Sequence, residues 1–434
     1  MHRVALLSAA LAAIALAVPS QAGAAAYVPG EVLVKYKDGT SGTVKQNVEA
    51  ATGTDREGAV PGGSRQLSIE DGASVKETVA ELRKDPNVEY AVPNYVARAS
   101  AFMPNDQGFY LQWNLSGPFG INMPDAWDIA RARGVPGGKG AVVAVLDTGV
   151  AYERYRRFRR APDLNRFVRG YDFVRRDPHP NDENGHGTHV AGTIAQSTNN
   201  VIGAAGIAYH AKIMPVRVLN AQGGGNVTWI ARGIRFAASR RVNVINLSLE
   251  FASWVRAAQI PDIVKAIRYA RRRGVLIVAA AGNESDTLVP YPARARDVLA
   301  VAGTTVRGCQ ADYSSSGVDV DLSAPGGGAD APNTNTPYDA RVCRPDAPGR
   351  YIFQQTFTSG ARTFGLPPGF EGTSMAAPHV SGVAALVIAS GRLGQRPPPR
   401  LVEQHLEGTA RDVGAPDFDP RYGHGLLDAA AALR

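Results

Sequence analysis

Residues 141–150 read AVVAVLDTGV. The residues that precede Asp147 in this stretch are all apolar, a pattern typical of a strand that is buried on both faces of a parallel sheet. Asp147 ends the run, and Thr148 and Gly149 predict a turn directly after it. Because catalytic and binding groups collect at the carboxyl ends of parallel strands, Asp147 is a candidate site residue.

The same strand pattern recurs along the chain and alternates with helical patterns. Further apolar runs lie at 213–219, 243–249, 275–281 and 297–302, and helical periodicity lies at 226–239, 260–273, 374–390 and 400–408. This alternation predicts an α/β fold with a doubly wound, mostly parallel sheet and helices on both faces. The Gly/Pro-rich stretch 325–349 predicts a long loop.

The segment before this body has a different pattern. Residues 31–36 alternate as a half-buried strand, residues 73–84 read as an amphipathic helix, and residues 88–96 read as a second extended segment. Together they predict a small α+β domain. Residues 27–100 carry 9 basic and 11 acidic residues, whereas residues 101–434 carry 37 and 28, so an acidic domain precedes a basic body.

The composition and the first 26 residues limit the class of protein to which the chain can belong. The chain has 434 residues, 44% of them hydrophobic and 20% charged, which is typical of a globular protein and excludes a fibre or a polytopic membrane protein. Residues 1–26 have the layout of a secretory signal peptide: a positive head, an apolar run and small residues. The run is shorter than the about 20 residues that a membrane span needs, although an uncleaved anchor is the alternative. We therefore expect a secreted protein without a stable membrane anchor.

Cys309 and Cys343 are the only cysteines. Since an oxidising compartment favours their pairing, export predicts a disulfide between them, and two free buried thiols are the alternative.

Three more polar residues have the chemistry of a nucleophilic site. His186 lies in NGHGTHVAGT, Ser374 lies at the predicted start of a helix in EGTSMAAPHVSG, and Asn283 follows the strand pattern VLIVAAA. A serine becomes nucleophilic when an imidazole takes its proton, and a carboxylate such as that of Asp147 orients the imidazole. A helix N-terminus and an amide N–H can stabilise the oxyanion that forms.

The motifs VLDTGV, GHGTHVAG and GTSMAAPHVSG, in this order, resemble those of the subtilisin-like serine proteases, and the resemblance covers about residues 105–432. Within that family, PND at 104–106 and PDAWDIA at 124–130 are similar to the thermitase branch. The front segment resembles the family's inhibitory propeptide through VPGEVLVKYK and NVEYAVPNY. The resemblance implies a propeptide at 27–103 and a subtilisin-like catalytic domain at 104–434.

The resemblance also implies a function. It is that of a self-processing zymogen of a serine endopeptidase, in which Ser374 attacks, His186 is the base, Asp147 orients His186 and Asn283 binds the oxyanion. A catalytically silent binding protein on the same fold is the alternative. A second alternative makes His186 and His189 metal ligands, but no Glu lies between them, as a zinc protease would need.

Two further segments resemble the walls of the family's substrate cleft, Gly223-Gly224-Gly225 and Ser248-Leu249-Glu250. Such a cleft binds a peptide as an added strand. Glu250 departs from the family pattern, because glycine usually follows Ser-Leu there. Its side chain either turns to solvent or places a carboxylate near the first specificity pocket, where it would favour basic or polar residues before the scissile bond.

A structural Ca²⁺ site is implied by the resemblance of residues 198–204 to the family's main calcium loop. The implied ligands are side-chain oxygens of Asp106, Asp163 and Asn200 and carbonyl oxygens of Thr198, Ile202 and Ala204. A second, thermitase-like site would use Asp172, Asp177 and Asn181, but Arg175 stands where an acid would help, which argues against it.

The segment 151–180 carries nine arginines with interleaved aromatic residues. A nucleic-acid site would use such residues, but arginine is common throughout this chain, so we interpret the segment as a solvated charged surface. We expect protein or peptide substrates and the chain's own propeptide as partners, no nucleic acid, and a monomer.

Overall fold

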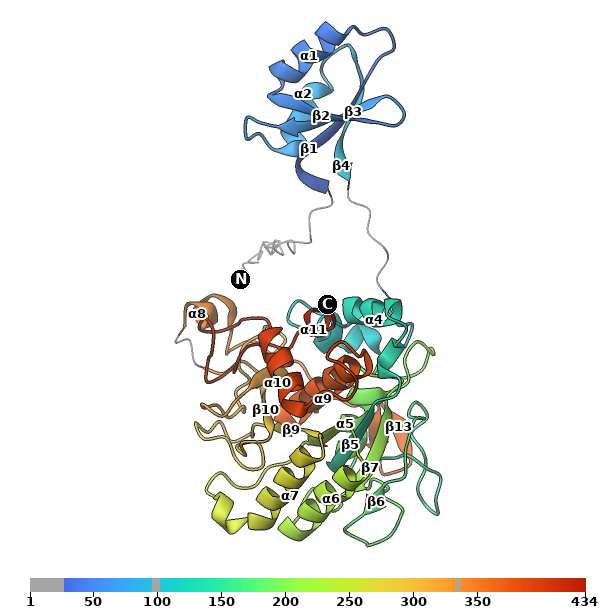
Figure 1. Cartoon of the computed structure of the whole chain (residues 1–434), viewed down its shortest axis with the longest axis vertical. Helices are drawn as coiled ribbons and strands as arrows, with labels where there is room; N and C mark the ends of the chain where they lie inside the picture. Colours follow the sequence, from blue (N-terminus) through green and yellow to red (C-terminus); the bar gives the residue numbers. More distant parts are fainter. Residues whose placement is uncertain (1–26, 96–101, 333–335) are drawn as a thin grey trace, which may run out of the picture. The chain divides into compact units, whose positions relative to one another are not determined.

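The computed structural model describes residues 27–95, 102–332 and 336–434, so the predicted signal peptide lies outside the described residues. They form two compact units, one before and one after the boundary between Ser100 and Ala101 (Figure 1). Among the described residues, no helix has the length and apolar character needed to cross a membrane.

The N-terminal unit is a four-stranded antiparallel sheet with two helices. Its strands are ordered β2-β3-β1-β4. The elements are β1 (Tyr27–Tyr36), α1 (Gly42–Ala51), β2 (Thr54–Val60), β3 (Ser64–Ile69), α2 (Val75–Leu82) and β4 (Val88–Tyr95). Both helices contribute to one apolar core with Val32 and Val34 of β1. The small α+β fold is as predicted, but α1, β2 and β3 were not, because β2 is a largely polar strand at the edge of the sheet.

The C-terminal unit contains a seven-stranded sheet in the order β11-β10-β9-β8-β5-β7-β6, and all of its paired strands are parallel. The strands are β5 (Val142–Asp147), β6 (Tyr171–Asp172), β7 (Lys212–Arg217), β8 (Val244–Leu247), β9 (Leu276–Ala280), β10 (Leu299–Thr304) and β11 (Leu322–Pro325). Strand β5 therefore lies inside the sheet, with β8 and β7 on either side.

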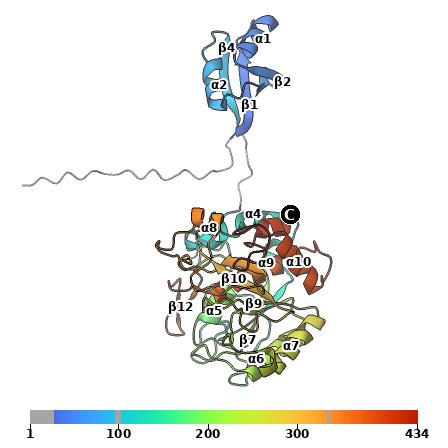
Figure 2. The same cartoon turned by 90° about the vertical axis from the view of Figure 1, so that its left-hand side faces the viewer.

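Helices cover both faces of this sheet. Val143 and Val145 of β5 belong to the same core cluster as helices α5 (His186–Ala195) and α9 (Thr373–Ala389). Ala144 and Leu146 point the other way, into the core with α6 (Val227–Ser239) and α7 (Pro261–Arg272). Two views show α6 and α7 lying side by side (Figure 1 and Figure 2). The predicted doubly wound α/β fold is confirmed.

The remaining elements complete the unit. They are α3 (Trp113–Ser116), α4 (Met123–Ala132), α8 (Pro337–Val342), the hairpin strands β12 (Thr356–Ser359) and β13 (Thr363–Gly365), α10 (Pro399–Gly408) and α11 (Ala429–Leu433). Helix α8 lies inside the predicted loop 325–349, so that stretch is not structureless. Its N-cap Thr336 accepts a hydrogen bond from the backbone of Asp339, which explains how so short a helix can begin in a Gly/Pro-rich segment.

Candidate active site

A cavity of about 520 Å³ lies at the carboxyl ends of the central strands. The residues that line it come from six separate segments of the sequence: Thr148; Asn184 and His186; Leu219, Gly223, Gly224, Gly225 and Ile230; Ser248, Leu249, Glu250 and Phe251; Ala280 and Asn283; and Ser374. The fold thus brings the candidate base, nucleophile, oxyanion donor and both candidate cleft walls to one cavity.

Asp147 and His186 are in direct contact below this cavity. Asp147 is fully buried at the end of β5, and its Oδ1 lies 2.7 Å from Nδ1 of His186. A quarter of the His186 side chain, 26%, is exposed to the cavity side. Burial opposes the charged imidazole, but the negative charge of Asp147 and this hydrogen bond outweigh it and raise the pKa of His186 above its ordinary value.

The first turn of α5 holds His186 close to β5, and every backbone N–H there has an acceptor. Thr148 Oγ1 accepts from Gly187, Asp182 Oδ2 accepts from Thr188, and Asn184 Oδ1 accepts from His186 itself. A Cβ on Gly187 would lie 2.1 Å from the carbonyl oxygen of Gly149, so only glycine allows the approach. Gly185 and Gly187, the glycines on either side of His186, therefore allow α5 to begin close to β5.

Helix α9 presents Ser374 from its first turn, directly after Gly372, whose φ of 138° favours glycine. The Ser374 hydroxyl donates to the carbonyl oxygen of Ser248, 3.4 Å away, and Ser248 Oγ donates to the Ser374 carbonyl at 2.8 Å. Within the described part of the chain, the backbone N–H of Ser374 has no acceptor. This N–H is therefore free to donate to a ligand at the positive end of the helix.

The side chain of Asn283 is held by Thr373, the first residue of α9. Its Oδ1 accepts hydrogen bonds from the backbone N and the Oγ1 of Thr373, at 2.8 and 3.0 Å. The carbonyl end of the amide is held by Thr373, and its NH₂ end also interacts with the Glu250 carboxylate. Because an NH₂ group has two N–H donors, one can serve another acceptor. Ser374 N–H and the Asn283 amide thus provide two donors beside the serine hydroxyl.

Comparison with known proteins identifies the family at this point. The model of the subtilase family matches residues 138–425. This chain belongs to the subtilase family. A fervidolysin N-terminal prodomain matches residues 14–94, a match that begins within the predicted signal peptide, so the boundary at residue 26 stays a prediction.

Relatives of this subtilase are proteases of known name. The chain is 34% identical to the thermophilic serine proteinase of Bacillus sp. (strain AK1), over 92% of this chain and 86% of the relative. It is 37% identical to thermitase of Thermoactinomyces vulgaris, over 67% and 87%. A solved structure of proteases from Pseudoalteromonas arctica PAMC 21717 is 33% identical, with a TM-score of 0.62, over 76% of this chain and 99% of that one. This subtilase is therefore a serine endopeptidase with an N-terminal propeptide.

The other two histidines near the site are buried and held by the protein. His189 Nε2 lies 3.0 Å from the Ile352 carbonyl, and burial lowers the pKa of His189 to about 3. His379 contacts the Met375 carbonyl and Asn114, and burial lowers its pKa to about 4. The metal-ligand interpretation of His186 with His189 does not fit, because these imidazoles face Asp147 and a backbone carbonyl respectively.

The loop at 198–204 has a donor set that fits a calcium ion. Asp106 and Asp163 are almost fully buried and close to each other, and Asn200 Nδ2 donates to Asp163 Oδ1 at 2.6 Å. In the described residues, no carbonyl of Thr198, Ile202 or Ala204 accepts a hydrogen bond. A Cβ at Gly203 would lie 2.5 Å from Asp163 Oδ2, so the loop curves tightly around that carboxylate.

The second, thermitase-like set of Asp172, Asp177 and Asn181, against which Arg175 already argued, does not fit a calcium ion. Asp172 Oδ1 accepts from the backbone N of Val174 and Arg175, and its Oδ2 faces Nη1 of Arg217 at 3.2 Å. Arg217 is 2% exposed and also pairs with Glu183, which Arg157 and Arg175 contact as well. The guanidinium of Arg217 therefore supplies the positive charge beside Asp172. In the arginine-rich segment 151–180, Arg157 and Arg175 form ion pairs with Glu183.

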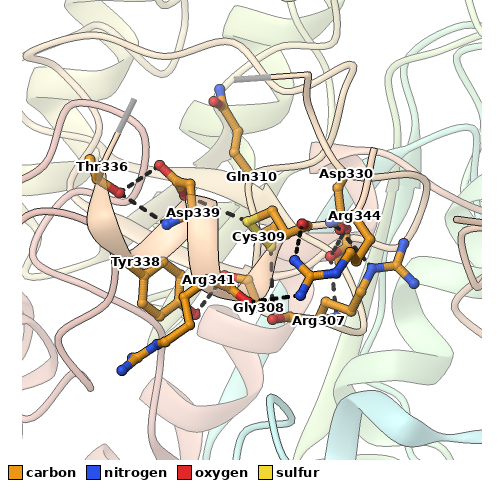
Figure 3. The surroundings of a disulfide bond; sticks show 12 residues. Arg307, Gly308, Cys309, Gln310, Asp330, Thr336, Tyr338, Asp339, Arg341 and Arg344 are labelled. Carbon is orange, nitrogen blue, oxygen red and sulfur yellow. Dashed lines mark hydrogen bonds and ion pairs between the residues drawn. A yellow bond between two sulfur atoms is a disulfide. The ribbon is translucent and has the colours of Figure 1, made fainter. Parts of the chain in front are cut away.

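The two cysteines are not among the residues that line this cavity and are joined, with their sulfurs 2.05 Å apart. Figure 3 shows Arg307, Asp330 and Arg344 gathered beside the bridge. Asp330 accepts from Arg307 Nε and from the backbone of Arg344, both at 2.6 Å. Cys309, Asp330 and Cys343 also have the geometry of a possible metal group, but the covalent bond occupies both sulfurs. The bridge instead attaches the loop after α8 to the turn after β10.

Sequence reasoning missed the residues that hold the site together. Asp182 is buried and accepts hydrogen bonds from the side chains of Thr148 and Thr188 as well as from backbone groups of the first turn of α5. No local signal identifies Asp182, because the N-cap of α5 is Gly185 and Asp182 lies three residues before it. Thr373 offers no such signal, because its partner Asn283 is remote in sequence.

Proposed function

We propose that this subtilase is a secreted, self-processing zymogen that hydrolyses peptide bonds through an acyl-enzyme formed on Ser374. The observation that carries the proposal is the 2.7 Å contact of Asp147 with His186, which lines the same cavity as Ser374. The N–H of Ser374 has no acceptor among the described residues. Acyl transfer requires a hydroxyl, a general base and an anion site in one place, and Ser374, His186 and Asn283 line the same cavity.

The mechanism follows from these positions. Ser374 Oγ turns from the Ser248 carbonyl, gives its proton to His186 Nε2 and attacks the substrate carbonyl carbon. The oxyanion accepts hydrogen bonds from the Ser374 N–H and the Asn283 amide. His186 then donates the proton to the leaving amine, which breaks the peptide bond and leaves an ester on Ser374. Water hydrolyses that ester with His186 again as base, and Asp147 stabilises the imidazolium in both steps.

The substrate would bind between two walls of the cavity, Gly223–Gly225 and Ser248–Glu250. The first wall has no side chains, and Gly223 has a φ of 81°, so a peptide backbone can approach closely. We propose protein and peptide substrates, the chain's own propeptide (27–103) as inhibitor, a catalytic domain at 104–434, and a monomer. The signal-like segment 1–26 supports secretion.

Ser374→Ala tests the proposal most simply. The variant should fold and reach the medium, yet neither hydrolyse casein nor separate its propeptide in a host without other extracellular proteases. Ser285→Ala, at an exposed loop serine, is the matched control and should process normally. Normal propeptide removal in Ser374→Ala would overturn the assignment.

We also propose one structural Ca²⁺, held by Asp106, Asp163, Asn200 and the carbonyls of Thr198, Ile202 and Ala204. Bound calcium joins two buried carboxylates to the loop, so its removal should destabilise the folded state by about 3–4 kcal/mol at a concentration 100–1,000 times Kd. Thermal unfolding with and without a chelator measures this. Asp163→Asn should abolish the chelator effect, whereas Asp172→Asn should retain it; an equal effect in both would contradict the assignment.

A further inference from the structure

The side chain of Glu250 is the one acidic group that lines the catalytic cavity. It does not turn away to solvent: its Oε2 accepts a hydrogen bond from the backbone N of Asn283 at 3.1 Å. The same oxygen lies 2.8 Å from where a Cβ on Gly282 would be, so the carboxylate is packed against the segment that carries Asn283.

This position relates Glu250 to the scissile bond. The proposed oxyanion belongs to the residue whose carbonyl Ser374 attacks, and that oxyanion contacts the Asn283 side chain. A carboxylate held on the backbone of Asn283 is therefore within reach of the side chain of that same substrate residue. Glu250 lies on the Ser248 wall, which contacts Ser374 directly through Ser248.

Two more carboxylates lie next to Glu250. A neighbouring cavity of about 630 Å³ shares Glu250 and Phe251 with the catalytic cavity, and Glu284, Asp286 and the exposed Trp254 line it as well. Neither cavity is lined by Lys or Arg. In the described part of the chain none of the three carboxylates is in a salt bridge, although basic residues outnumber acidic ones, 47 to 39. Unpaired carboxylates beside an exposed indole form an environment that favours a cation.

A negative charge at Glu250 also affects the proposed chemistry. An oxyanion that develops beside Asn283 is repelled by an unneutralised carboxylate nearby. A substrate cation seated on Glu250 removes that repulsion as the transition state forms, so it should raise kcat as well as lower KM.

We infer that Glu250 is a specificity-determining residue that makes this protease cleave after lysine or arginine. The inference rests on the proposed function, since it needs Ser374 and Asn283 in their assigned roles. In a simple occluding role the Glu250 side chain would only fill the pocket and favour small residues, so lysine and norleucine, which are similar in length, would be cleaved equally.

Peptide anilides that differ only in the residue before the scissile bond test this inference. Lysine, norleucine and glutamate at that position vary the charge while the length stays similar. In the wild-type enzyme we expect kcat/KM for lysine to exceed that for norleucine by at least about tenfold, with glutamate the poorest, and part of the difference in kcat. Glu250→Gln keeps the shape and removes the charge, so it should make lysine and norleucine equal.

Matched variants separate the possible failures. Glu407→Gln removes a half-buried carboxyl outside both cavities and should keep the lysine preference. Equal wild-type rates for lysine and norleucine, or a lysine preference that survives in Glu250→Gln, would overturn the inference while casein hydrolysis left the proposed function intact. If wild type cleaves neither the anilides nor casein, the proposed function itself fails.

Discussion

The first turns of α5 and α9 bring the proposed base and nucleophile to one cavity, but they are built in different ways. Each helix follows a glycine with positive φ, Gly185 at 107° and Gly372 at 138°. In α5 the N–H groups of the first turn all find protein acceptors, whereas in α9 the N–H of Ser374 has none among the described residues.

This difference matches what each helix start is proposed to do. Free N–H groups at a helix start attract negative charge. The start of α5 is saturated by Thr148, Asp182 and Asn184, so its role is to fix the His186 side chain. The anion that its N–H groups face is Asp182, whereas Asp147 contacts the imidazole. At the start of α9 the N–H groups of Thr373 and Met375 have acceptors. Among the described residues the N–H of Ser374 has none, so it can receive an anion that exists only during the reaction.

The largest effect is expected when the carboxylate that contacts His186 loses its negative charge. Asp147→Asn leaves the shape but removes the charge that orients His186, so kcat should fall by about 10⁴-fold. Because Asp147 raises the pKa of His186, its loss lowers that pKa, and the acid limb of the pH–rate profile should move to lower pH. A pH profile of residual anilide hydrolysis measures both; an unmoved acid limb would contradict the role of the Asp147 charge.

Asn283→Ala tests the proposed anion site beside the start of α9, because it removes one of the two proposed oxyanion donors. We expect kcat to fall by about 10²–10³-fold with KM little changed, because the hydrogen bond forms only in the transition state. Asn226→Ala is a control, since this asparagine caps α6 and does not line the cavity. A loss carried by KM alone would argue against the oxyanion role.

A smaller effect is expected when one of the hydrogen-bond acceptors at the start of α5 is lost. In Asp182→Asn, one oxygen that accepts from Thr148 or Thr188 is lost, so His186 should be less firmly placed and kcat should fall by about 10–100-fold. Since the Asp182 charge also raises the pKa of His186, the acid limb should again move to lower pH. Unchanged kinetics with lowered thermal stability would make Asp182 a purely structural residue.

The comparison also shows which parts of the molecule the sequence can predict. Continuous apolar runs located β5, β7, β8, β9 and β10, and local motifs located Asp147, His186 and Ser374, because each signal lies within a few residues. By contrast, the pairing of Arg217 with Asp172 and the hold of Thr373 on Asn283 join segments that are remote in sequence. No local pattern encodes such contacts. Arg175 in the sequence already argued against the second calcium set, but the pairing of Asp172 with Arg217 followed only from the packed side chains.

The orientation of the Glu250 side chain could not be predicted from the sequence for the same reason. Its sequence position left two orientations open, and only its contact with the backbone of Asn283 placed the carboxylate in the cavity. Sequence motifs therefore identified the two walls of the cavity, whereas the presence of a carboxylate inside the cavity followed only from the tertiary structure.

The most direct test of the proposed acyl transfer is to locate the product of a serine-directed fluorophosphonate on the mature protein by mass spectrometry. We predict a single labelled peptide that contains Ser374, with labelling abolished in Ser374→Ala and strongly slowed in Asp147→Asn. Labelling of another serine, or none in a preparation that hydrolyses casein, would contradict the assignment of Ser374 as the nucleophile.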